Sequence, residues 1–346
     1  MSENLFKQGG QYNIKKTGRD SYQFQIPLNT DEHGRLAREC PNDSCSPGYF
    51  KLKPGTGIMG VQSVVYCPYC RHEDEPNSFV TKEQMRYAND IMMREAHQGI
   101  ERMMKDALGI GSSGKKKIGG GMFSMELSYK PSRPPYVRRP FEEEVLRMVI
   151  CPNCGLNHAV FGLAIWCPDC GKDIFMTHVN AEYDVVRVML GDIDRRQKEL
   201  GHRIAARDME NCLEDTVSIF EAVLKAFYLR YLQGKGETSE KIQLVFENKI
   251  KNGFQNPKRA EELIRNRLQL SLFECLTSEQ FDFVCEAFEK RHPITHNLGV
   301  IDKKYLEKAV AAEKKGREIR VTQEEVLRAI DISFRVLENL HSKLFM

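Results

Sequence analysis

Long apolar runs are missing from this sequence of 346 residues. No stretch approaches the roughly 18 consecutive apolar residues that a membrane-spanning helix needs, so no such helix is expected. The opening residues, MSENLFKQGG, also lack a basic segment followed by an apolar one, and we therefore expect no secretory signal. The default expectation is a cytoplasmic protein.

An excess of charge of one sign is missing as well. The sequence has 51 Lys and Arg residues against 48 Asp and Glu, a net charge of +3, which does not by itself indicate a nucleic-acid partner. Two basic runs stand out locally, Lys115-Lys116-Lys117 and Arg138-Arg139, and both lie in segments that look flexible. RNA contact and simple solvation of loop charges are both compatible with these runs.

Cysteine, in contrast, is abundant. Eight of the eleven cysteines fall in four close pairs. In a reducing compartment, paired spacing favours metal ligands over disulfides. The other three, Cys212, Cys275 and Cys285, lie on apolar helical stripes and are expected to be small buried hydrophobic residues.

The paired cysteines make two sets of four. The first set combines a C-x4-C pair with a C-x-x-C pair, and the second combines two C-x-x-C pairs twelve residues apart. Zinc prefers four soft ligands in a tetrahedron, and two tight turns that face each other supply them. The sequence therefore predicts two zinc ribbons, each with a structural zinc ion, held by Cys40, Cys45, Cys67 and Cys70 and by Cys151, Cys154, Cys167 and Cys170.

Four cysteines leave no open position on the metal for hydrolytic chemistry. Each site is either a docking surface for nucleic acid or protein, or a replacement for a core too small to be stable alone. His33, His72 and His158 lie near the cysteines, but neither set needs a further ligand. Because β-type runs precede both Cys67 and Cys167, the two ribbons look like a diverged repeat.

The expected fold class is α+β with several domains. Two small β zinc-ribbon modules precede an all-α antiparallel bundle. The expected segments are a first ribbon with N-terminal strands (1–80), a helix and flexible Gly/Lys linker (81–121), a second ribbon (122–180), a connecting helix (181–202) and the helical bundle (203–346).

Gly109, Gly114 and Lys115 match the phosphate-loop pattern G-x-x-x-x-G-K. Lys116 follows, however, where a Ser or Thr would hold magnesium, and the preceding segment has the pattern of a helix and not of a strand. A linker is therefore favoured over an ATP-binding loop, which stays as a minor alternative.

From about residue 203 onward, apolar residues recur at steps of three and four, as in amphipathic helices. Possible capping boxes begin at Thr81, Thr277 and Thr322. Four or five such helices with short connections are typical of an antiparallel bundle.

Within the bundle, polar residues gather after the helix that contains Phe281 and Phe288. The segment Arg291-His292-x-x-x-His296-Asn297 has the form R-[NDH]-x3-H. With its helical context, it resembles the HEPN superfamily, whose helical bundles carry an R-x4-6-H motif. The resemblance covers about residues 203–346.

The resemblance implies an RNA endonuclease that works as a dimer with a composite active site. His296 would be the general acid or base and Arg291 the phosphate clamp. His292 would orient the substrate or the arginine, and Asn297 would form a hydrogen bond nearby. Attack by the RNA 2′-hydroxyl needs no metal ion and leaves a 2′,3′-cyclic phosphate. Glu221 and Lys225 match a secondary E-x3-K pair of some HEPN families, although an ordinary i,i+4 surface ion pair is the favoured explanation.

Related domains are commonly toxins or antiviral defence effectors, and a regulatory or antitoxin partner would then be expected. The alternative is a non-enzymatic protein whose zinc ribbons bind nucleic acid or a regulatory partner and whose bundle only dimerises. A helix-end role for the Arg–His motif, with cations near carbonyl groups, would fit this alternative.

Overall fold

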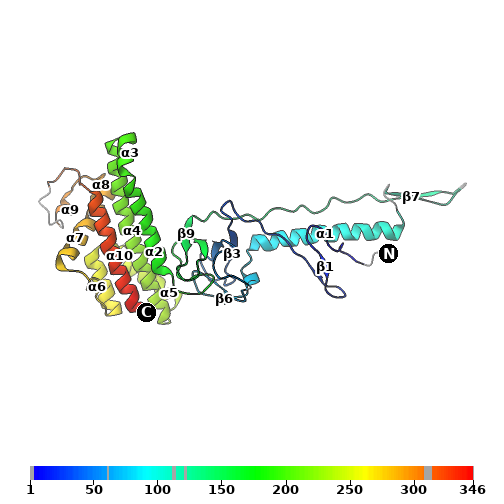
Figure 1. The fold of residues 1–346 in the computed structure, drawn as a ribbon, viewed down its shortest axis with the longest axis horizontal. Helices are drawn as coiled ribbons and strands as arrows, with labels where there is room; N and C mark the ends of the chain where they lie inside the picture. The colour runs from blue at the N-terminus through cyan, green and yellow to red at the C-terminus, as the bar shows by residue number, and fades with distance from the viewer. Residues whose placement is uncertain (1–3, 61, 111–113, 121–122, 308–313, 346) are drawn as a thin grey trace. The chain divides into compact units, whose positions relative to one another are not determined.

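The computed structural model describes residues 4–345 except 61, 111–113, 121–122 and 308–313. The chain divides into two compact units, Met1–Ile174 and Phe175–Met346. Small sheets lie in the first unit and the second is helical (Figure 1), as the α+β prediction requires at this level. Among the described residues, every helix is too short or too polar to cross a bilayer.

In its described residues, the first unit contains one sheet of four strands and three of two strands. The central sheet has the order β3-β4-β10-β9, and every neighbouring pair is antiparallel. The strands of this unit are β1 (Lys15–Lys16), β2 (Tyr22–Gln23), β3 (Leu36–Glu39), β4 (Tyr49–Leu52), β5 (Val65–Tyr66), β6 (Glu73–Asp74), β7 (Lys115–Ile118), β8 (Met125–Ser128), β9 (Arg147–Ile150) and β10 (Asn157–Val160). Its helices are η1 (Pro76–Phe79) and α1 (Lys82–Leu108).

The central sheet joins the two expected ribbons into one body. Each ribbon gives one hairpin, β3–β4 or β9–β10, with a cysteine pair in the turn. The inner strands are β4 and β10. Tyr49, the first residue of β4, pairs with β3, and Asn157, the first residue of β10, pairs with β9. Two residues further along each strand, Lys51 and Ala159 pair with each other. The register therefore has an approximate two-fold axis through this pair, as a diverged repeat predicts.

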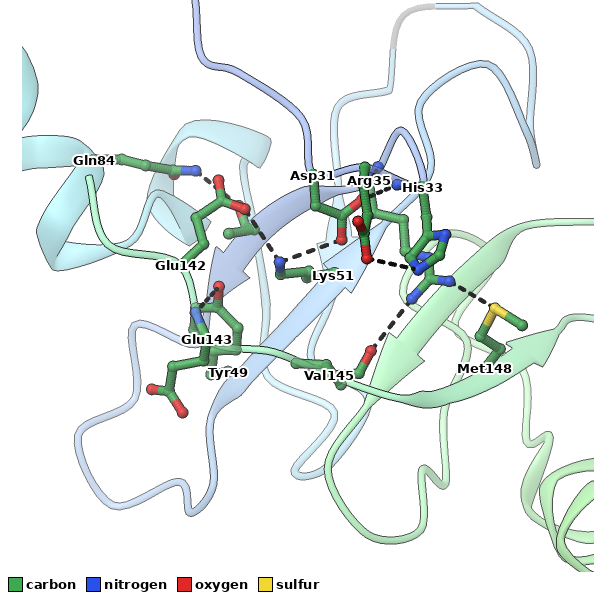
Figure 2. Close-up of polar contacts among 12 residues, drawn as sticks. Asp31, His33, Arg35, Tyr49, Lys51, Gln84, Glu142, Glu143, Val145 and Met148 are labelled. Carbon is green, nitrogen blue, oxygen red and sulfur yellow. Dashed lines mark hydrogen bonds and ion pairs between the residues drawn. The ribbon is translucent and has the colours of Figure 1, made fainter. Parts of the chain in front are cut away.

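The two faces of the sheet differ in polarity because side chains alternate along a strand. Phe50 and Val160 lie on the face that packs with cysteines of the first set. On the opposite face, Lys51 has a nearly buried side chain, with Nζ 3.3 Å from Asp31 and 3.1 Å from Glu142. Figure 2 shows the lysine between the two carboxylates, which join the loop before β3 to the segment before β9.

Helix α1 begins with the predicted capping box. The Thr81 side chain accepts a hydrogen bond from the backbone of Gln84, and the Gln84 side chain accepts one from Thr81. The N-terminal segment packs on this helix, with Tyr12, Ile14 and Ile91 in a shared apolar cluster.

Part of the expected linker after α1 forms a strand of a hairpin. Gly109 ends the helix in the left-handed conformation, and Lys115–Ile118 then pairs with Met125–Ser128. A Gly-rich turn allows this reversal, which periodicity alone did not indicate. The segment follows a helix and enters a strand, the reverse of the strand-to-helix order of a phosphate loop; its residues 111–113 lie outside the described part of the chain.

The second unit is a helical bundle around α4 and α10. These two helices run parallel, because Phe227 near the end of α4 contacts His341 near the end of α10, whereas α2 runs antiparallel to both and begins at Phe175 beside these residues. The prediction of an antiparallel bundle is therefore wrong for the central pair. Leu213, Phe220 and Phe227 on α4 are fully buried, as are Ile330 and Leu337 on α10. The elements are α2 (Phe175–Gly191), α3 (Ile193–Leu200), α4 (His202–Gly234), α5 (Ser239–Val245), η2 (Phe246–Ile250), η3 (Gly253–Gln255), α6 (Pro257–Leu268), α7 (Ser278–Glu289), α8 (Arg291–Asn297), α9 (Lys303–Leu306) and α10 (Gln323–Phe345).

The segment expected to connect the two halves belongs to the bundle instead. Val179, Tyr183, Val186 and Leu190 of α2 are buried, and the helix packs on α4 and α10. Their spacing of three and four residues is an apolar stripe that the many charges of residues 180–207 obscured. The second compact unit accordingly begins at Phe175 and not at residue 203, and the second ribbon ends at Ile174.

Candidate functional site

The eight predicted ligand cysteines form two groups of four that could hold a metal ion. In the first group, the Sγ atoms of Cys40 and Cys70 are 3.7 Å apart and those of Cys45 and Cys67 are 3.6 Å apart. The second group has 3.7 Å between Cys151 and Cys170, and 3.5 Å between Cys154 and Cys167. A tetrahedron with metal–sulfur bonds of about 2.3 Å has edges of about 3.8 Å, close to these separations.

Neither group includes a histidine among the described residues. Burial raises the pKa of Cys45 to about 12 and that of Cys154 to about 11. A bound cation would offset this cost, because it stabilises the thiolate form that a ligand requires.

Three of the four cysteine turns share one backbone pattern. In each, the residue four positions after the first cysteine donates its backbone N–H to the carbonyl of that cysteine. The backbone N–H of the same cysteine donates to the carbonyl of the residue five positions after it. The fourth-position residue has a positive φ angle in every case, and it is Arg71, Gly155 or Gly171. Such turns hold two thiols on one side of the backbone, which explains the C-x-x-C spacing.

The second cysteine turns of the two ribbons bind each other reciprocally. The N–H of Tyr66 donates to the carbonyl of Pro168 at 2.9 Å, and the N–H of Trp166 donates to that of Pro68 at 3.1 Å. The two hydrogen bonds are equivalent in the two ribbons. In each, the donor is the residue just before the first cysteine of one turn, and the acceptor is the residue just after the first cysteine of the other turn. The guanidinium of Arg71 also lies 4.6 Å from the ring centre of Trp166. The two cysteine groups are therefore joined by a symmetric contact.

In the helical unit, a chain of polar contacts holds Arg291 of α8. Its Nη1 donates to the Gln255 side-chain carbonyl at 2.8 Å, and the Gln255 amide donates to Glu221 at 2.6 Å. Lys225 completes the chain with its Nζ 2.7 Å from Glu221. Glu221 is buried, so the E-x3-K pair is not merely a surface ion pair.

The histidines of α8 lie on another face of the helix. His292 and His296 are four residues apart, and their ring centres are 5.1 Å from each other. His292 is half-buried with its Nε2 3.6 Å from Asp302, which also accepts a 2.7 Å hydrogen bond from Asn297. His296 is exposed and borders a shallow hollow that also includes Lys315. Its ring nitrogens have no hydrogen-bond partner in the described part of the chain.

The structure thus places all four predicted α8 residues on one short helix but in two settings. Arg291 belongs to an inward network, whereas His292, Asn297 and His296 surround the loop at Asp302. Arg291 and His296 are five positions apart in the sequence, which corresponds to about 140° around an α-helix. Sequence analysis missed Gln255, because an isolated glutamine in a short 3-10 turn carries no pattern.

No protein-family model matches the chain, and searches of curated proteins and of solved structures find no significant similarity.

Proposed function

We propose that the protein is an RNA endonuclease of the HEPN type, with its active site on α8. The observation that carries the proposal is that one short helix bears both a tethered arginine and an exposed imidazole. Arg291 is fixed through Gln255 and Glu221, while His296 is accessible to a substrate. An arginine held by its own protein has less freedom to lose when it binds a phosphate.

The proposed reaction requires no metal ion. An imidazole takes the proton of the RNA 2′-hydroxyl while that oxygen forms a bond to phosphorus. The bond from phosphorus to the 5′-oxygen breaks, and a second imidazole gives its proton to the leaving oxygen. The arginine stabilises the extra negative charge of the transition state. The products are a 2′,3′-cyclic phosphate and a 5′-hydroxyl.

A homodimer would supply the groups that one chain lacks. Because Arg291 and His296 diverge around the helix, they are poorly placed to act on one phosphate from a single chain. Two copies with facing α8 helices would bring together two arginines and two imidazoles. His292, held near Asp302, would then orient the substrate, and Asn297 would fix the loop beyond the helix.

The two cysteine groups fit structural Zn²⁺, and we include two zinc ions per chain in the proposal. Four thiolates at tetrahedral separations form a closed site of the kind that zinc prefers. Their role would be to stabilise the small first unit. A cytoplasmic toxin or defence effector, restrained by a partner, is the biological setting that the family resemblance suggests.

The test uses purified zinc-loaded protein and total cellular RNA, with His296→Ala as the variant. His202→Ala is the matched control, because His202 is an exposed histidine of the same unit outside α8. We expect fragments with cyclic-phosphate ends from the wild type and the control, and at least a hundredfold fewer from His296→Ala. A parallel sample with a chelator separates metal-dependent cleavage from the proposed reaction.

Two results would contradict the nuclease. Cleavage that His296→Ala leaves unchanged would move the activity away from α8 or to a contaminant. Intact RNA, bound by a folded dimer without cleavage, would favour the non-enzymatic alternative in which the bundle only dimerises.

A further inference from the structure

A basic, aromatic-containing segment of the first unit has no role in either cysteine site. Residues 114–120 and 123–139 contain seven Lys and Arg residues and one acidic residue, although the whole chain has a net charge of only +3. We refer to this segment as the basic arm. Its cations are Lys115, Lys116, Lys117, Lys130, Arg133, Arg138 and Arg139.

The arm consists of the β7–β8 hairpin and an extended stretch that follows it along α1. Lys105 of α1 lies 5.7 Å from the ring centre of Tyr129, and Arg86 donates to the backbone carbonyls of Arg138 and Arg139. Figure 1 shows this stretch running beside the helix. At about 3.3 Å per residue, the extended part from residue 129 to 139 is on the order of 35 Å long.

Most of the positive charge on the arm is not neutralised. Lys115 pairs with Glu126, and Arg138 pairs with Glu83. The other basic side chains, including Lys117, Lys130, Arg133 and Arg139, form no ion pair within the described ranges, and all are exposed. Like charges along an extended strip repel one another, so the strip is suited to a polyanion.

Exposed aromatic rings alternate with these cations. Phe123 is 86% exposed, Tyr136 is 84% exposed and Phe141, just beyond the arm, is 70% exposed. Exposed rings of this kind provide flat surfaces for stacking. Cations that follow a backbone, with aromatic side chains between them, are the combination that binds unpaired bases and their phosphates.

We propose that the basic arm binds single-stranded nucleic acid. The proposal does not require that α8 cleaves RNA, although such an arm would hold a substrate for that site. An anionic membrane is the competing ligand, because Ile118, Phe123 and Met125 are exposed at the hairpin. A membrane site would concentrate its contacts there, whereas four of the seven cations lie beyond the hairpin, along the extended stretch.

The experiment measures binding of the full-length zinc-loaded chain in the His296→Ala background, so that cleavage does not interfere. The probes are a fluorescent single-stranded RNA without secondary structure, the matching DNA strand and an RNA duplex. The arm variant changes Lys115, Lys116 and Lys117 to Ala. The control variant changes Lys235, Lys241 and Lys249, three exposed lysines of the helical unit, and so removes equal charge.

We expect the arm variant to bind single strands about tenfold more weakly and the control to bind as the parent does. The slope of log affinity against log salt should fall by about 2 in the arm variant, since each phosphate contact on a single strand contributes about 0.7. RNA and DNA single strands distinguish whether a 2′-hydroxyl is also recognised. Equal losses in the two triple variants would contradict a local binding site.

The aromatic part of the proposal has its own control. Phe123→Ala should weaken single-strand binding by about five- to a hundredfold, and Phe123→Leu should weaken it similarly, because leucine keeps the apolar bulk but cannot stack. Vesicles of equal parts phosphatidylcholine and phosphatidylserine test the competing ligand. The proposal would be overturned if the parent chain bound the vesicles but not the single strands, and if Phe123→Leu bound the vesicles equally well.

Discussion

Arg291 donates a 2.8 Å hydrogen bond from its guanidinium to the side-chain carbonyl of Gln255. The same amide donates in the opposite direction to Glu221, so only one orientation of the amide satisfies both neighbours. The neutral Gln255 thus bridges the buried carboxylate of Glu221 and the guanidinium of Arg291, so that Glu221 helps to fix the position of Arg291.

Gln255→Ala should lower the single-turnover rate of RNA cleavage by about tenfold or more, because it removes a hydrogen bond to a charged group worth about 1.5–3 kcal/mol. Helical circular dichroism should not change. Gln243→Ala is the matched control, since this exposed glutamine also donates a hydrogen bond to a glutamate, Glu247, but lies on the surface outside the network of Arg291. If both variants cleave at the wild-type rate, Gln255 has no positioning role.

Lys51→Ala should destabilise the first unit by roughly 3 kcal/mol. The change leaves Asp31 and Glu142 close to the sheet without their shared cation, and breaking such a pair is costly. Urea unfolding of the zinc-loaded protein measures the change. A variant that also carries Asp31→Asn and Glu142→Gln should recover most of the loss, because no carboxylate then lacks a partner. A loss that persists in this triple variant would mean that packing of the lysine stem matters more than charge.

Acid should release the extended stretch of the arm from α1. Hydrogen bonds from Arg86 and from the backbone N–H of Phe141 lower the pKa of Glu83 to about 2. Because the folded-state pKa lies below the ordinary value of 4.5, this contribution to stability is complete above pH 4.5 and is lost as the pH falls towards 2.

Amide exchange at Phe141, corrected for its intrinsic rate, measures this release. We expect protection to fall between about pH 4.5 and 2 in the wild type. In Glu83→Gln it should be weak and independent of pH, whereas Glu95→Gln on the same helix should behave as the wild type. Protection in Glu83→Gln that equals the wild type at neutral pH would rule out this contact as the anchor.

Cys151→Ser should reduce bound zinc from two equivalents per chain to about one. Chelation of both ions should unfold the first unit and leave the helical signal of the second, which contains none of the eight ligands. Cys212→Ser is the control, because Cys212 is buried in α4 far from either group in the sequence. Metal analysis with circular dichroism measures both effects. Two equivalents retained by Cys151→Ser would remove this cysteine from the ligand set.

Much of this architecture was predictable because its causes are local. Cysteine spacing correctly predicted both groups of four, since a C-x-x-C turn is fixed by adjacent residues. Thr81 and Thr277 correctly predicted two helix starts for the same reason. The sequence could not predict that β4 pairs with β10, because that contact joins segments more than 100 residues apart and each strand is only four residues long.

The candidate site on α8 shows the same limit. The motif from Arg291 to His296 was visible as a pattern, and its nuclease role stays a prediction. The link from Arg291 through Gln255 to Glu221 depends on how η3 packs against α4, and no periodicity indicates it. The apolar stripe of α2 was present in the sequence, but the surrounding charges led to its assignment as a connector.

The reciprocal hydrogen bonds of Tyr66 and Trp166 have a consequence for how this chain tolerates change. The two halves of the first unit are held together like the subunits of a dimer, and either half alone would expose β4 or β10 as an unpaired edge. The polypeptide between them, from α1 to the end of the basic arm, is therefore an insertion between the two halves of one sheet. Such an insertion can become longer or shorter at small entropic cost to the sheet, because the cost of closing a loop depends only weakly on its length. Its length and its charged residues can therefore change more freely than the sheet, and with them the ligand that it binds.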